Sequence, residues 1–89
     1  MDKIFVKIYG QVQGIGYRWF VLETAKKYNL SGWVKNCQDL TVECAVKGFD
    51  EEIKKFLNDI KTKHPLAFVE KMEIKKFEEE IEDEFLIKR

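Results

Sequence analysis

The chain has 89 residues, the size of one small domain, and we expect residues 1–89 to form a single unit. Its 16 basic and 16 acidic residues give a net charge of zero, whereas a dedicated nucleic-acid binder usually carries a basic excess. Lysines interrupt the N-terminal apolar run, and no stretch approaches the length of a membrane span. We therefore expect a cytoplasmic monomer with neither a nucleic acid nor a membrane as its partner.

The side chains that bind metals most often are sparse and scattered. Cys37, Cys44 and the single histidine, His64, do not stand at metal-ligand spacing, so the sequence predicts no metal site. Both cysteines are expected to be reduced thiols. We interpret His64 as a helix-end residue, and Trp19 and Trp33 as packing residues.

The first predicted element is a strand over Lys3 to Tyr9. Ile4, Val6 and Ile8 alternate with the residues between them, which is the period of a strand covered on one side. These three β-branched side chains are expected to face the core.

The stretch that follows, YGQVQGIGYRW from Tyr9 to Trp19, contains Gly14, Gly16 and Arg18. Glycines let backbone N–H groups converge on a small anion, and the first turn of a helix adds unpaired N–H groups. An arginine at the helix start supplies a planar fork of donors that suits phosphate oxygens. The stretch favours a site for a phosphate-like group. Its glycine spacing matches neither the dinucleotide fingerprint nor the Walker loop, so ordinary turn glycines and a solvated arginine are the alternative interpretation.

A helix is predicted from Arg18 to Tyr28, because Val21, Leu22, Ala25 and Tyr28 recur at helical spacing. Asn29 stands where a left-handed residue would end this helix.

Two further strands, Gly32 to Cys37 and Leu40 to Lys47, are expected to form a hairpin that turns at Gln38 and Asp39. The inner face of the second strand would carry Leu40, Val42, Cys44 and Val46.

The second predicted helix begins near Asp50, a candidate N-cap, and Pro65 stops it. Its apolar stripe comprises Ile53, Phe56, Leu57 and Ile60. A strand is predicted from Ala67 to Phe77 with Phe68, Met72 and Ile74 on one face. The acidic run Glu78 to Glu84 is expected to be a solvated connection to a short last strand, Phe85 to Ile87.

The order of elements is βαββαβ with a short terminal strand. It predicts an α+β fold of the ferredoxin-like, split βαβ type, in which two helices cover one face of an antiparallel sheet. In that arrangement the first helix leads directly into the strand that ends with Asn36, so this side chain can lie near the glycine loop. An asparagine close to a turn more often bonds its own backbone, and that alternative stays open.

At these motifs the sequence resembles the acylphosphatase family. The similarity comprises Gly10, VQGIGYR from Val12 to Arg18, GWVKN from Gly32 to Asn36, Val42, Gly48, Pro65, Ala67 and Val69. The resemblance implies hydrolysis of the carboxyl–phosphate bond of acyl phosphates without a metal or cofactor, with inorganic phosphate as product or competitor. It also implies that Arg18 binds the phosphate and Asn36 holds the attacking water. Backbone N–H groups would come from the loop residues Gln13, Gly14, Ile15, Gly16 and Tyr17.

One departure from the family pattern lies in the hairpin turn, where Asp39-Leu40 replaces the usual Asp-Gly. If this position requires a positive φ, leucine there costs about 1–2 kcal/mol.

The sequence leaves two other functions open. The first is a non-catalytic module of the same fold that binds an anion or a protein. The second is single-stranded RNA binding, for which Phe5 and Tyr9 could stack on bases. The third strand offers no aromatic partner for them, because Thr41, Glu43, Ala45 and Lys47 cannot stack.

Overall fold

The structure is a computed structural model that describes residues 1–89. Its elements in chain order are β1 (Asp2–Gln11), α1 (Tyr17–Lys27), β2 (Ser31–Asn36), β3 (Val42–Gly48), α2 (Asp50–Thr62), β4 (Phe68–Lys76) and β5 (Phe85–Lys88). This order confirms the predicted ferredoxin-like α+β arrangement. Neither helix is long and apolar enough to cross a membrane.

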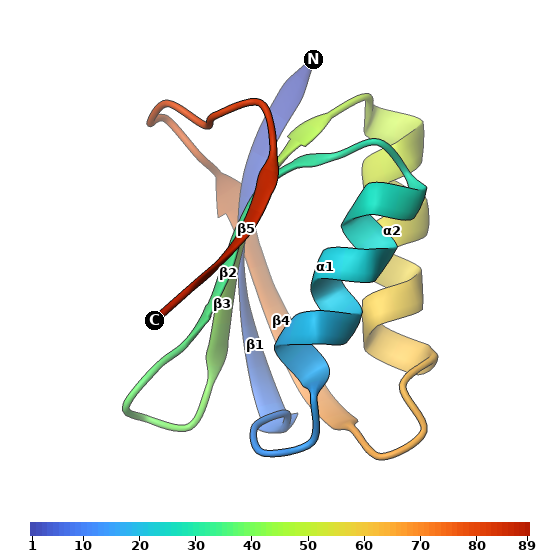
Figure 1. Ribbon diagram of the computed structural model, residues 1–89, viewed down its shortest axis with the longest axis vertical. Coiled ribbons are helices and arrows are strands. Elements are labelled where there is room, and N and C mark those ends of the chain that lie inside the picture. The colour runs from blue at the N-terminus through green and yellow to red at the C-terminus, as the bar shows by residue number, and fades with distance from the viewer.

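The sheet has the strand order β4-β1-β3-β2-β5, and both helices lie on the same face of it (Figure 1). The first four strands pair antiparallel, as expected. The terminal strand β5 instead runs parallel to β2, so the complete sheet is mixed. This parallel edge brings the end of β5 beside the end of β2.

The core lies between the sheet and the two helices. Alternation places Val6 and Ile8 of β1 on the covered face, and both are fully buried. The helices contribute stripes at 3.6-residue spacing. The buried residues of these stripes are Val21, Leu22 and Ala25 from α1, and Ile53, Phe56 and Ile60 from α2.

Two residues other than glycine have a left-handed backbone conformation. Asn29 ends α1 with a φ of 57°, as predicted. Leu40, predicted to begin the inner face of a strand, lies instead in the hairpin turn with a φ of 72° and is 69% exposed. The strand begins only at Val42, because the tight turn requires a residue of positive φ where the leucine stands.

The start of α2 and the face of β4 also differ from expectation. The N-cap of α2 is Phe49, and Asp50 is its first helical residue, where it pairs with Lys54 at 3.1 Å instead of capping. In β4 the pairing with β1 shifts register after Tyr9, so Phe68 points to solvent while Met72 packs on the core. A bulge of this kind reverses which side chains face inward, and alternation alone does not reveal it.

The acidic connection is less solvated than predicted. Ile81 within it is buried, and the Lys47 ammonium donates to its carbonyl at 3.0 Å. Lys3 donates to the carbonyl of Glu79 at 2.8 Å. These contacts hold the connection, which leads into β5, against the end of the sheet.

Candidate active site

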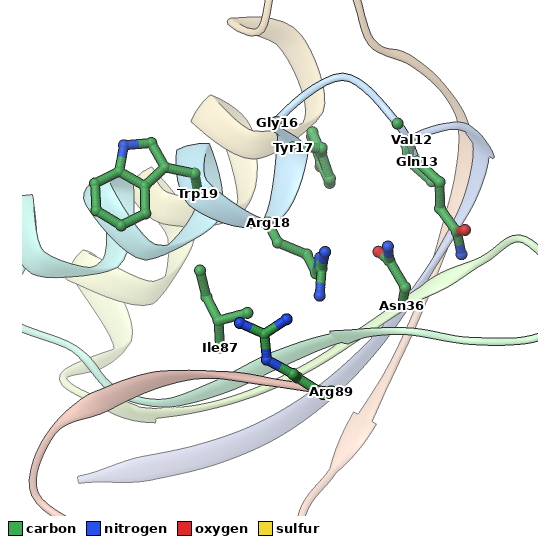
Figure 2. A pocket seen from close by; sticks show the side chains of 10 residues that line it. Val12, Gln13, Gly16, Tyr17, Arg18, Trp19, Asn36, Ile87 and Arg89 are labelled. Atoms are coloured by element: carbon green, nitrogen blue, oxygen red, sulfur yellow. The ribbon is translucent and has the colours of Figure 1, made fainter.

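A pocket of about 250 Å³ opens where the β1–α1 loop meets the ends of β2 and β5 (Figure 2). It is lined by Val12, Gln13, Gly14, Gly16, Tyr17, Arg18, Trp19, Asn36, Ile87 and Arg89. The fold thus brings together the glycine loop, Arg18 and Asn36, which the sequence analysis had selected from separate segments. Of the predicted loop residues, only Ile15 does not line the pocket, because its side chain packs against the core.

The shape of the loop depends on its two glycines. Gly14 and Gly16 have φ values of 78° and 74°, in the left-handed region that β-carbons disfavour. A β-carbon added at either position would meet no atom within 4 Å. Glycine is required here by backbone conformation, and the space over the loop is open to a ligand.

The backbone N–H groups of the loop are free. Among the backbone hydrogen bonds outside the regular helices and strands, none has a donor between Gln13 and Trp19. The last of these residues form the first turn of α1, where N–H groups have no intrahelical acceptor. That turn also contains no acidic residue, so nothing offsets the positive end of the helix dipole. Free donors and a positive helix end together make a site that favours an anion.

Arg18 projects from this first turn into the pocket (Figure 2). It is half-buried, yet its guanidinium takes part in none of the ion pairs of the protein. A guanidinium without a protein partner can direct its full set of donors at phosphate oxygens.

Asn36 is the last residue of β2, and its side chain points toward the space in front of Arg18 (Figure 2). Its Oδ1 atom is buried and is the only buried side-chain nitrogen or oxygen in the protein without a hydrogen-bond partner. Buried polar atoms are almost always satisfied, so this oxygen requires a donor from a water or a ligand. The alternative interpretation, an asparagine bonded to its own backbone, is therefore wrong for Oδ1.

The side chain of Gln13 also binds the β2–β3 turn, a contact that was not predicted from the sequence. Its Nε2 atom donates to the carbonyls of Cys37 at 2.9 Å and Thr41 at 2.8 Å, on both sides of the β2–β3 turn. Gln13 thereby ties the glycine loop to the hairpin that carries Asn36. The only sequence signal was a polar residue between Val12 and Gly14, which does not reveal a partner 24 residues away.

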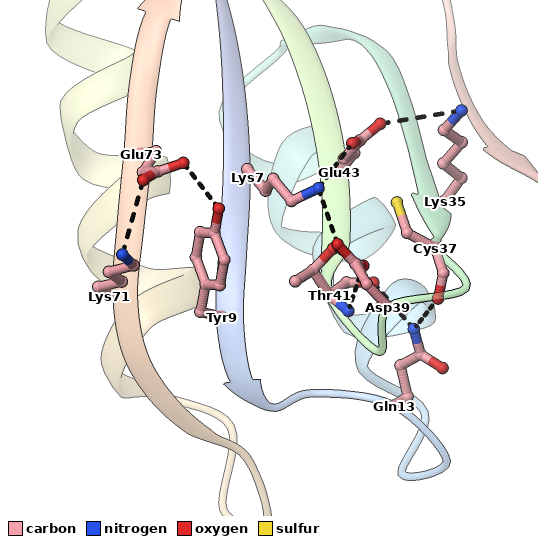
Figure 3. A network of polar contacts seen from close by, with 10 residues as sticks. All are labelled: Lys7, Tyr9, Gln13, Lys35, Cys37, Asp39, Thr41, Glu43, Lys71 and Glu73. Carbon is pink, nitrogen blue, oxygen red and sulfur yellow. Dashed lines mark hydrogen bonds and ion pairs between the residues drawn. The ribbon is translucent and has the colours of Figure 1, made fainter.

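A polar network on the open side of the sheet shapes the same turn (Figure 3). The Asp39 carboxylate accepts from the backbone N–H and the hydroxyl of Thr41, and it pairs with Lys7 at 3.1 Å. The pKa of Asp39 is lowered to about 2. The main cause is the hydrogen bond from the Thr41 hydroxyl, and the next is the hydrogen bond from Lys7. The charged form of Asp39 therefore stabilises the turn.

Tyr17 and His64 hold the loop to α2. The Tyr17 hydroxyl donates to the carbonyl of Ile60 at 2.6 Å, and burial raises the pKa of this phenol. His64 packs its ring edge-on against Phe20, and its Nδ1 atom accepts from the backbone N–H of Leu66. His64 does not line the pocket, consistent with its interpretation as a helix-end residue.

Four lining residues were not assigned to the site from sequence, and one of them, Val12, is a buried residue directly before the loop. Trp19, expected to be a packing residue, is 60% exposed at the pocket. Ile87 and Arg89 reach the pocket from β5 and from the residue just after it. The alternation of Phe85, Ile87 and Arg89 was a usable signal, since it places a cation at the end of an inward-facing row.

The arrangement suits transfer of a phosphoryl group to water. It offers free N–H donors, one arginine for phosphate oxygens and one unsatisfied amide oxygen that can accept from a water. The structure contains no group of three or more histidine, cysteine, aspartate or glutamate side chains placed to bind a metal ion. Fold and pocket together define a ferredoxin-like domain with a glycine loop that favours an anion at one end of its sheet.

Comparison with known proteins agrees with this class. The Acylphosphatase family model matches residues 4–87. The chain is 37% identical to an acylphosphatase of Clostridium acetobutylicum, over 85% of this chain and 84% of that protein. The crystal structure of acylphosphatase from Bacillus subtilis superposes with a TM-score of 0.94 at 31% identity and covers all of both chains. This chain belongs to the acylphosphatase family.

A longer relative matches as well. The chain is 43% identical over 97% of its length to a probable carbamoyltransferase HypF of Methanocaldococcus jannaschii, of which it spans only 12%. The family thus includes stand-alone proteins of this size and domains of much larger proteins.

Proposed function

We propose that this domain hydrolyses acyl phosphates to a carboxylate and inorganic phosphate, with Arg18 and the Gln13–Tyr17 backbone as phosphate ligands and Asn36 as the water ligand. Membership of the acylphosphatase family makes the chain a hydrolase of acid anhydrides. The roles of individual residues are the proposal. The observation that carries it is the buried, unpartnered Oδ1 of Asn36, aimed at the space in front of Arg18.

The phosphoryl group is bound first. Its oxygens take hydrogen bonds from the free N–H groups of the loop and from the guanidinium of Arg18. These donors are fixed by Gly14, Gly16 and the first turn of α1 before substrate arrives. Preorganised donors stabilise the charge that spreads over the phosphoryl oxygens in the transition state.

Water is placed second. Asn36 Oδ1 accepts one O–H of the water and directs its oxygen at phosphorus. A new P–O bond forms while the bond from phosphorus to the acyl oxygen breaks, and the carboxylate leaves with the bonding electron pair. The carboxylate is a weak base and needs no proton from the enzyme, which fits a pocket lined by no acidic residue or histidine. The proton lost by the water passes to an oxygen of the substrate's own phosphate.

An isotope experiment tests where the water attacks. Hydrolysis of acetyl phosphate in ¹⁸O-enriched water should place the label in inorganic phosphate, because Asn36 directs water at phosphorus. Label in acetate would mean that water attacks the carbonyl carbon, and the assignment of Asn36 would then be wrong. Omission of the enzyme gives the background distribution as the control.

A second candidate function is favoured by the 43% identity to the HypF protein. A domain that works within a carbamoyltransferase would act on carbamoyl phosphate, itself a carboxyl–phosphate anhydride. A kcat/KM for carbamoyl phosphate at least tenfold above that for acetyl phosphate would support this candidate, and the reverse ratio would exclude it. A monomeric state and a cytoplasmic location are also part of the proposal. The two free cysteines, Cys37 and Cys44, support a reducing compartment.

A further inference from the structure

Both arginines of the chain line the same pocket. The other basic residues are lysines, and none of them reaches it. No aspartate or glutamate lines it either, although the chain has 16 acidic residues. Arg18 is the proposed ligand of the phosphoryl group. Arg89 is therefore a second cation to which the proposed hydrolysis assigns no role.

The parallel pairing of β5 with β2 sets the place of Arg89. Ile87 lies opposite Val34 and Lys88 opposite Lys35, so the next residues, Arg89 and Asn36, come level with each other. Side chains alternate along both strands, and Val34 is buried against the helices. The side chains of Arg89 and Asn36 therefore share the helix-covered face. Figure 2 shows the guanidinium of Arg89 beside Ile87, pointing into the space below Arg18.

Like Arg18, Arg89 has no partner in the protein. It takes part in none of the ion pairs, nor in any of the side-chain hydrogen bonds. Arg89 is exposed, so water screens its repulsion from Arg18, but an anion beside both guanidinium groups would still be attracted by each of them. A ligand with two separate negative groups would neutralise both.

The geometry of phosphoryl transfer indicates which part of the substrate lies near Arg89. The attacking water and the leaving oxygen stand roughly in line on opposite sides of phosphorus. With water on Asn36, the acyl group leaves on the far side of Arg18. That side is formed by Ile87 and Arg89, while the indole of Trp19 lies farther out and points away from them (Figure 2).

We propose that Arg89 is a specificity-determining residue that binds a carboxylate at the far end of the acyl group. The preferred substrates are short monoacyl phosphates of dicarboxylic acids, since Ile87, beside the guanidinium of Arg89, can pack on the few methylene groups between the two anions (Figure 2). Arginine suits this task because its planar fork binds carboxylates with two parallel hydrogen bonds. The inference rests on the proposed function, because it takes Arg18 as the phosphate ligand and Asn36 as the water ligand.

Binding of stable analogues tests the proposal without turnover. 4-Phosphonobutyrate carries a carboxylate that butylphosphonate lacks. Calorimetric titration should give wild type a Kd for 4-phosphonobutyrate roughly tenfold below that for butylphosphonate, the upper range for a bidentate arginine–carboxylate pair at an exposed site. Arg89→Gln should remove most of that preference, and Arg89→Glu should reverse it. Equal Kd values in wild type, or a preference that survives in Arg89→Gln, would overturn the proposal.

Lys88→Gln is the matched control. It removes a charge of the same sign one residue away, but Lys88 lies on the opposite face of β5, with its ammonium 4.5 Å from the centre of the Trp33 ring. This variant should keep the tenfold preference. Its loss in Lys88→Gln would attribute the effect to overall charge and contradict a specific role of Arg89.

Kinetics extend the test to substrates. Wild type should show a kcat/KM for succinyl phosphate roughly tenfold above that for butyryl phosphate, and Arg89→Gln should bring the ratio near one, mainly through KM. A similar fall for both substrates would make Arg89 a second phosphate ligand and overturn the proposal. If neither substrate is hydrolysed, the proposed function fails, and the phosphonate titrations still decide the role of Arg89.

Discussion

The side-chain amide of Gln13 donates a hydrogen bond of 2.9 Å to the carbonyl of Cys37, the residue directly after Asn36. This bond joins the glycine loop to the end of β2, which carries Asn36, the proposed water ligand. The distance between these two parts of the site therefore depends on a side chain that need not touch the substrate itself.

Gln13→Ala should lower kcat more than it weakens phosphate binding. The variant loses both bonds to the hairpin, so Asn36 is less firmly held while the glycines and Arg18 stay in place. Loss of two partly buried hydrogen bonds should also lower the free energy of unfolding by about 1–3 kcal/mol. Steady-state kinetics and urea unfolding measure the two effects. Gln11→Ala, at an exposed glutamine of β1, is the control and should change neither. An unaltered kcat in Gln13→Ala would show that the hairpin positions Asn36 without it.

Arg18→Ala should lower kcat/KM for acetyl phosphate by at least about 10³-fold, because it removes the only cationic ligand assigned to the transferred group. Inorganic phosphate should lose its competitive inhibition in the same variant. Arg18→Lys keeps the charge but lacks the planar fork, so its kcat/KM should lie between those of wild type and Arg18→Ala. Activity of Arg18→Ala within a few-fold of wild type would contradict the assignment.

Asn36→Ala should depress kcat by about 10²-fold or more while inorganic phosphate still binds with nearly wild-type affinity. The reason is that Oδ1 is assigned to the water and not to the phosphate. Phosphate titrations and initial rates separate the two quantities. A variant that lost phosphate affinity but kept kcat would make Asn36 a substrate ligand.

Leu40→Gly should raise the melting temperature. Leucine at a φ of 72° costs about 1–2 kcal/mol, and the side chain is too exposed to recover that by burial. The more flexible unfolded chain of a glycine variant offsets part of the gain, so we expect a rise of a few degrees. Asn29→Gly is the matched control, because asparagine tolerates its φ of 57° and the change should be smaller. A lower melting temperature for Leu40→Gly would indicate that the exposed leucine makes contacts worth more than the strain.

The ionisation of Asp39 should make the free energy of unfolding depend on pH in the acid range. Its pKa is lowered to about 2 in the folded protein from an ordinary value of 3.8, so the unfolded chain binds the proton more readily. The contribution is complete above the ordinary value and is lost as the pH falls from about 4 toward 2. Urea unfolding from pH 6 to pH 2 should show a shallower acid loss in Asp39→Asn than in wild type. Asp2→Asn, at an exposed carboxylate without an ion pair, controls for the change in net charge. Parallel curves for wild type and Asp39→Asn would exclude a role of Asp39 in acid unfolding.

Some features were predictable because they depend on short-range patterns. Alternation in Lys3 to Tyr9 and helical spacing after Arg18 are set by backbone geometry, and the structure confirms both elements. The left-handed conformation of Asn29 followed from its place after a helix. The face of Phe68 was predicted wrongly, because a bulge is invisible to a pattern that assumes strict alternation.

The sequence by itself determined the elements, their order and the chemical character of the glycine loop, because each of these follows from residues near one another along the chain. Only the tertiary structure decided which distant side chains share the pocket. The pairing of β5 with β2 brings Arg89 level with Asn36, and the amide of Gln13 meets carbonyls beyond β2. Such relationships depend on strand order, direction and register. These in turn arise from the packing of the whole sheet against two helices, which no local pattern encodes.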